Sequence, residues 1–94
     1  MTQLVARRIK KDVLSWRVSV NDGTPYFGFV GQDFKAVRSD GMMMLKDPQW
    51  KANHALPVAD GVYDEGTAPT RDEAALALAR ACGIADAVPP EVWP

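Results

Sequence analysis

Apolar and polar residues alternate most strictly between residues 13 and 20, with the two-residue period of a β-strand. Four large apolar side chains share one face, Leu14, Trp16, Val18 and Val20, while serines and an arginine share the other. This period is typical of a strand with one buried face. We therefore expect a strand over residues 13–20, with Trp16 anchored in the core beneath a helix.

Weaker patterns predict further strands on either side of it. Residues 3–10 alternate loosely and are expected to form a first strand. The Asn-Asp-Gly-Thr sequence at 21–24 is typical of a tight hairpin turn and predicts an antiparallel return over residues 26–30. Residues 34–38 and 42–46 flank a Ser-Asp-Gly turn sequence and predict a second hairpin.

Gly28 and Gly31 interrupt the aromatic strand at 26–30. A glycine within a strand usually marks a β-bulge or a close approach of another part of the chain. We expect one of these two features at the glycines.

One α-helix is specified at both ends, over residues 70–83. Thr70 and Glu73 have the spacing of a capping box, in which each side chain accepts a hydrogen bond from the other residue's amide. Gly83 can adopt the left-handed conformation that ends helices. Small and apolar residues form one stripe that we expect to pack on the sheet: Ala74, Ala77, Leu78, Ala81 and Cys82.

The remaining segments have less regular patterns. Asp47 and Pro48 predict a short helix through Trp50. Residues 51–69 read as a long irregular region, either a true loop or an edge hairpin. Residues 84–94 form a proline-rich tail, in which Val92 and Trp93 are expected to dock on the domain.

Together these elements predict an α+β fold in a single domain spanning residues 1–94. A small antiparallel sheet of about four strands in meander order, over residues 3–46, is expected to pack on the helix at 70–83. A variable loop region would occupy residues 47–69, and the tail residues 84–94.

Composition narrows the functional classes. The sequence has no apolar run long enough to cross a membrane and no signal-peptide pattern, so we expect a cytoplasmic protein without membrane contact. Cys82 is the only cysteine, which excludes an internal disulfide and a multi-cysteine zinc site. The net charge of −1 conceals a basic segment near the N-terminus.

Candidate catalytic chemistry is sparse. His54 with Asp60, Asp64 and Glu65 could be read as a metal or acid–base cluster, but the spacing matches no known ligand pattern. Cys82 near a helix C-terminus is in the wrong place for a reactive thiolate. The sequence also lacks phosphate-loop, GxSxG and HExxH motifs. We therefore predict no catalytic residues, no metal, no cofactor and no enzyme activity.

A surplus of large apolar side chains points instead to protein binding. The chain has more aromatic and methionine residues than one helix can easily cover, and such residues outside a core tend to be interface anchors. A larger protein or complex is the predicted partner, with a homodimer through a sheet edge as a further possibility. The candidate binding residues are Tyr26, Phe27, Met43, Trp50, His54 and Tyr63.

Nucleic-acid binding is the alternative. Basic residues cluster in the first two predicted strands and could place positive charge on a sheet surface. The pI of about 5.7 and the acidic C-terminal half oppose this interpretation. The candidate residues are Arg7, Arg8, Lys10, Lys11 and Arg17.

In size and layout the chain resembles many short accessory proteins of phages and mobile elements, some of which inhibit host complexes by binding. The resemblance covers the general form, a small sheet with a capped alanine-rich helix, and no specific motif. It implies a small inhibitor or adaptor of a larger complex.

Overall fold

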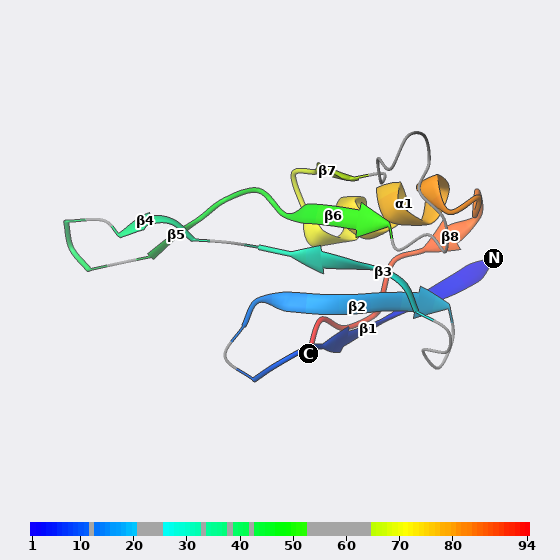
Figure 1. Ribbon diagram of the computed structural model, residues 1–94, viewed down its shortest axis with the longest axis horizontal. Helices are drawn as coiled ribbons and strands as arrows, with labels where there is room; N and C mark the ends of the chain where they lie inside the picture. The colour runs from blue at the N-terminus through cyan, green and yellow to red at the C-terminus, as the bar shows by residue number, and fades with distance from the viewer. Residues whose placement is uncertain (12, 21–25, 33, 38, 42, 53–64) are drawn as a thin grey trace, which may run out of the picture.

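A computed structural model describes residues 1–11, 13–20, 26–32, 34–37, 39–41, 43–52 and 65–94. They form a small single-domain α+β fold, in which one C-terminal helix packs on a curled, mixed sheet (Figure 1). The sheet has six strands: β1 (Thr2–Arg8), β2 (Ser15–Val20), β3 (Tyr26–Gly31), β6 (Gln49–Ala52), β7 (Glu65–Thr67) and β8 (Ala87–Val88). A separate hairpin contains β4 (Phe34–Val37) and β5 (Met43–Leu45), and the helix is α1 (Arg71–Ala81).

The strand order is β7-β6-β3-β2-β1-β8, so the prediction of an antiparallel meander of about four strands is wrong. The first three strands do pair in sequence, but β3 pairs next with β6 rather than with β4. β8 pairs with β1 in parallel, which makes the sheet mixed. Local alternation identifies strands, whereas these long-range partners are chosen by packing across the whole domain.

The segment after the second hairpin is a strand rather than the predicted short helix. Residues Gln49–Ala52 form β6, whose register with β3 pairs Trp50 with Val30 and Ala52 with Gly28. Asp47 and Pro48 therefore precede a strand, because pairing with β3 outweighs the local preference for a helix start. The predicted loop region 47–69 thus contributes two strands, β6 and β7, to the sheet.

The predicted second hairpin is present but stands apart from the main sheet. β4 and β5 pair only with each other among the described strands and extend from one end of the molecule (Figure 1, left). Gly41 in the connection has a φ of 86°, the left-handed conformation expected of a turn glycine. The hairpin therefore lengthens the molecule without adding to the core sheet.

The helix closely matches its prediction. Thr70 has extended dihedral angles and its Oγ1 accepts a hydrogen bond from the Glu73 amide at 3.1 Å. Gly83 has a φ of 88°, and the amides of residues 82–84 bond back to the last turn. The buried residues are Ala74, Ala75, Leu78 and Ala79. This face is rotated slightly from the predicted stripe, because the curled sheet brings β3, β6, β7 and β8 all into contact with α1.

The core lies between α1 and one face of the sheet. Leu4, Val18, Val30 and Ala52 supply its sheet side. Gly28 lets the helix approach closely: a Cβ there would meet the Leu78 side chain and would lie 2.5 Å from the Lys51 carbonyl oxygen. A register shift between β2 and β3 occurs next to Gly28, so both features expected of the strand glycines are found there.

The C-terminal tail closes one end of this core. Trp16 is fully buried, and its indole Nε1 donates to a carboxyl oxygen of the C-terminal Pro94 at 2.6 Å. Trp93 packs edge-on against it with ring centroids 5.4 Å apart, which confirms that Trp93 docks on the domain. Val92 does not, since 69% of it is exposed. The cover over Trp16 is therefore the tail together with Arg71 at the start of α1.

No helix among the described residues is long and apolar enough to cross a membrane.

Candidate binding face

The sheet has two different faces. Residues that sit directly opposite one another on neighbouring strands share a face. The core residues and α1 occupy one face. The other, which we call the helix-free face, is turned toward the viewer in Figure 1, with α1 behind the sheet.

A single cross-strand row runs over the helix-free face. Direct register partners connect β1, β2, β3, β6 and β7 through five residues: Arg7, Arg17, Phe29, Lys51 and Glu65. Neighbouring strands are about 4.8 Å apart, so the row extends over about 19 Å. Arg17 and Lys51 are the direct neighbours of Phe29, with Arg7 beyond Arg17 at one end of the row and Glu65 beyond Lys51 at the other.

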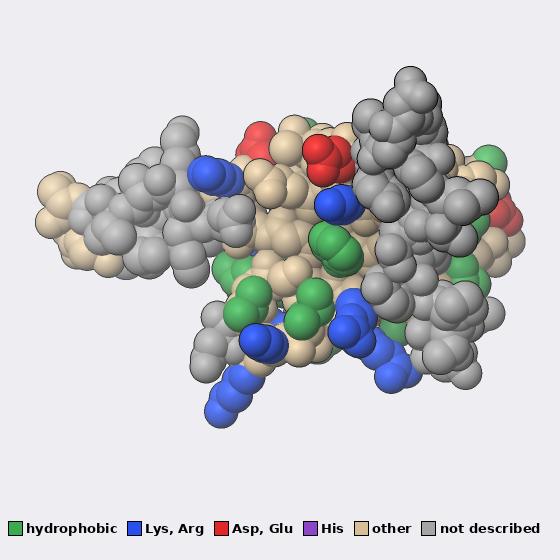
Figure 2. All heavy atoms as spheres, viewed as in Figure 1, with side chains coloured by type: hydrophobic (Ala, Val, Ile, Leu, Met, Phe, Trp, Pro, Cys, Tyr) green, Lys and Arg blue, Asp and Glu red, His purple; other side chains and the backbone are tan. Residues whose placement is uncertain are grey.

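Positive charge dominates this row. Arg7 and Arg17 are directly opposite each other, and Lys51 lies two strands further along the row. In Figure 2 several blue Lys and Arg side chains surround green apolar groups in the centre of the face, and red acidic groups lie above them and at the right edge. The row on the helix-free face therefore carries more cations than carboxylates, although the whole chain is slightly acidic.

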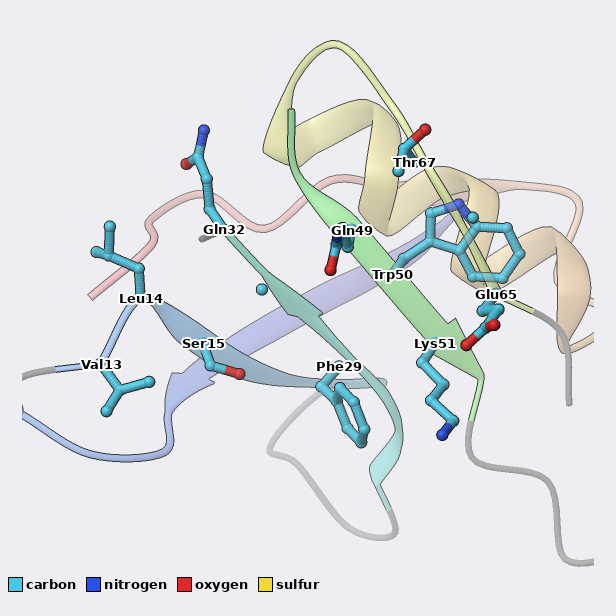
Figure 3. A pocket seen from close by; sticks show the side chains of 12 residues that line it. Val13, Leu14, Ser15, Phe29, Gln32, Gln49, Trp50, Lys51, Glu65 and Thr67 are labelled. Carbon is cyan, nitrogen blue, oxygen red and sulfur yellow. The ribbon is translucent and has the colours of Figure 1, made fainter. Parts of the chain in front are cut away.

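A hollow of about 690 Å³ lies beside the aromatic ring of the row. Phe29 and Lys51 project to the same side of the sheet from neighbouring strands (Figure 3). Val13 and Ser15 border the hollow from β2 and the turn before it, and Gln49 borders it from β6. The lining thus combines an apolar centre with hydroxyl and amide groups, as ligand sites generally do.

The predicted protein-binding residues do not form one cluster within the described part of the chain. Trp50 is half-buried and packs against the core, with its indole so close to Gly66 that an added Cβ would lie 3.0 Å from Nε1. The backbones of Tyr26 and Phe27 lie in β3, whereas Met43 lies in the separate hairpin. His54 and Tyr63 fall outside the described residues. Their binding roles remain predictions.

The predicted basic residues are divided between the two faces. Arg7 and Arg17 belong to the row, and Lys10 and Lys11 are exposed where β1 turns into β2. Arg8 points to the helix side, where its guanidinium lies 5.4 Å from the Trp16 ring centroid. The row on the helix-free face therefore contains two of the five predicted basic residues, Arg7 and Arg17.

Sequence reasoning missed Phe29 and Lys51 as members of the site. Alternation already separates Phe29 from Val30, which indicates which side of β3 it occupies. The local sequence does not indicate that Lys51 will lie beside Phe29, because the residues around Trp50 are predicted to form a helix rather than the strand that contains Lys51. The register of β6 against β3 is the missing information.

Candidate metal or catalytic groups are not assembled in the described part of the chain. No group of three or more His, Cys, Asp and Glu side chains there could hold a metal ion. His54, Asp60 and Asp64 lie outside the described residues, so that cluster is not tested. Cys82 is half-buried at the C-cap of α1. No protein-family model, curated protein or solved structure matches this chain.

Proposed function

We propose that this protein is a non-catalytic binding module that holds an acidic segment of a partner protein on its helix-free face. The observation that carries the proposal is the row in which Arg17 and Lys51 flank Phe29 and Arg7 lies beyond Arg17. Inhibition or assembly of a larger complex, as in the phage accessory proteins that the chain resembles in form, would be one use of such binding.

Phe29 supplies the apolar anchor. It is half-buried on a face that no described helix covers, and 44% of the neighbouring Val13 is exposed. Aromatic side chains at the centre of an interface contribute most of the binding energy, while surrounding groups mainly exclude water. Phe29 and the hollow beside it are therefore the expected centre of contact.

Arginine and lysine around that centre set the chemistry of the partner. Arginine is enriched in protein interfaces because its planar guanidinium pairs with carboxylates in a bidentate geometry. Ser15, Gln49 and Thr67 add neutral hydrogen-bonding groups on the side of the hollow. This arrangement favours a segment that carries Asp or Glu on both sides of an apolar residue.

Single-stranded nucleic acid is the second candidate, favoured by the same three cations. An aromatic ring on a sheet can stack a base while nearby cations contact phosphates. The row offers one described aromatic, whereas nucleic-acid sheets usually offer two or three. For this reason we rank an acidic protein segment first.

The test compares capture of partners by wild type and by face variants. The immobilised protein is exposed to nuclease-treated and untreated lysate, in parallel with Phe29→Ala, Arg17→Glu and the control Arg80→Glu. Arg80 is exposed in the last turn of α1, on the other side of the sheet. Recovered proteins and nucleic acid are quantified for each variant.

We expect a discrete set of proteins that survives nuclease, is lost with both face variants and is retained by Arg80→Glu. Nucleic acid recovered by wild type, released by moderate salt and lost with Arg17→Glu would instead support the second candidate. Partners retained equally by all variants would refute the helix-free face as the binding surface.

A further inference from the structure

Two guanidinium groups lie against the same indole on the helix side of the sheet. Arg8 of β1 is the direct register partner of Trp16 in β2, and its Cζ is 5.4 Å from the Trp16 ring centroid. Arg71 is the first residue of α1, and its Cζ is 4.4 Å from that ring. The guanidinium groups of Arg8 and Arg71 thus both lie close to the buried Trp16 indole.

These charges repel each other. Because both are so near one ring, the two guanidiniums lie within about 10 Å of each other, a range in which partly buried like charges interact appreciably. Burial lowers the pKa of Arg71, and the nearby Arg8 lowers it further. Keeping both groups charged at this position therefore costs free energy in the unliganded protein.

Within the described residues, neither arginine forms an ion pair, and the carboxyl group of the C-terminal Pro94 is bound by the Trp16 indole Nε1 at 2.6 Å. Arg71 Nε donates to the neutral Gln32 Oε1 at 3.0 Å, and Arg8 Nη1 donates to the Lys11 carbonyl oxygen at 3.3 Å. The neighbouring Asp72 accepts a hydrogen bond from Trp93 Nε1 at 2.9 Å. The salt bridge of the described residues lies elsewhere, between the amino terminus and Asp86.

We propose that Arg8 and Arg71 form a binding site for a phosphate-type oxyanion beside Trp16. Paired arginines recognise phosphate through short, charge-assisted hydrogen bonds. The Gln32 bond engages Nε of Arg71, and the terminal nitrogens make no hydrogen bond to the described residues. Arg8 is exposed and held by one long bond, so its side chain can turn toward an anion held by Arg71.

This site is independent of the proposed function. The alternation along β1 places Arg8 on the same side as the buried Leu4 and Ala6, opposite to Arg7. A ligand on the helix-free face would not reach it. The source of the anion is either free phosphate or the phosphate group of a nucleotide.

The site can be tested by titrating inorganic phosphate into the ¹⁵N-labelled protein and following two NMR signals. The Arg71 Nε–H and the Trp16 indole N–H both report on the cluster through their hydrogen bonds to Gln32 and Pro94. We expect saturable shifts of both signals with phosphate and none with sodium chloride of equal ionic strength. Shifts that follow ionic strength alone would overturn the proposal.

Variants of the two arginines provide the second readout. Arg8→Gln removes an exposed charge and is expected to retain the fold, yet to weaken phosphate binding about tenfold. Arg71→Gln should weaken it at least as much, and Arg80→Gln is the matched control with unchanged affinity. Equal affinity of wild type and Arg8→Gln would refute the paired site.

A parallel titration with adenosine 5′-monophosphate distinguishes the two sources. Trp16 is fully buried, so no base can stack on it, and we expect the nucleotide to bind no more tightly than phosphate. That result supports a site for the phosphate group alone. Tighter binding of the nucleotide, with the same dependence on Arg8, would support the site and identify a nucleotide as its ligand.

Discussion

The two faces of the sheet are built from the same strands but differ in their side chains, which are apolar and buried on the helix side and more polar and exposed on the helix-free side. On the helix side, Val18, Gly28 and Val30 pack against α1 without space for another methyl group at Gly28. On the helix-free side, Arg17 and Phe29 alternate with them, and Phe29 borders a hollow. Apolar packing is therefore concentrated on the helix side, and the helix-free side carries charges that a core would not tolerate.

Removing the largest helix side chain in the core should have the largest effect. Leu78 is fully buried, so Leu78→Ala loses apolar burial and leaves a cavity, at a cost of about 4 kcal/mol in the free energy of unfolding. Phe29→Ala, on the helix-free face, should cost about 1 kcal/mol. Urea denaturation measures both. Similar losses for the two variants would show that Phe29 belongs to the core.

Substituting one glycine on each face by alanine compares how tightly the two faces are packed, with a smaller change in side-chain volume than Leu78→Ala or Phe29→Ala. Gly28→Ala forces a methyl group against Leu78 and the Lys51 carbonyl, and we expect a loss of about 2–3 kcal/mol. Gly31→Ala places its Cβ 3.6 Å from Ser15 Oγ, an ordinary contact, and should change stability by less than about 0.5 kcal/mol. The prediction fails if thermal and urea unfolding rank the two in the reverse order.

The start of α1 offers a smaller effect. Thr70→Ala removes the acceptor for the Glu73 amide and should destabilise the protein by about 1 kcal/mol. Thr67 is exposed in β7 and provides the matched control, for which Thr67→Ala should have little effect. Circular dichroism during thermal unfolding compares them, and equal melting temperatures for both variants would contradict a capping role.

The smallest effect is expected from pH at the β1–β8 edge. A hydrogen bond from Thr2 Oγ1 lowers the pKa of Asp86, and the amino terminus lowers it further. A carboxyl whose pKa is lower in the folded state stabilises the fold above its ordinary pKa, and this contribution disappears as the pH falls. Between about pH 6 and pH 3, wild type should therefore lose slightly more stability than Asp86→Asn. Parallel thermal melts test this, and identical losses would contradict it.

The elements predicted correctly are those whose information is local. The cap at Thr70, the stop at Gly83 and the alternation through Trp16 and Val18 each lie within a few residues of the structure they specify. Such features depend on hydrogen bonds and periods that one segment contains by itself. They are sufficient to predict the helix and the first three strands.

The elements that were missed depend on distant partners. β6 directly follows a local helix-start sequence yet pairs with β3, and the two-residue β8 is recognised only through its pairing with β1. The candidate site follows the same rule. Arg7 and Arg17 were identified from charge, but their alignment with Phe29 and Lys51 needs the register of four strands.

The parallel pairing of β1 with β8 has a consequence for the order of folding. Thr2 and Asp86 are 84 residues apart, yet the Thr2 amide donates to the Asp86 carbonyl oxygen at 3.0 Å. Contacts at such separation form late, because the entropy of closing a long loop must be overcome first. During synthesis, β1 emerges from the ribosome long before β8. Until β8 arrives, that edge of β1 lacks its final partner, so a stalled or truncated chain is expected to be the most aggregation-prone species.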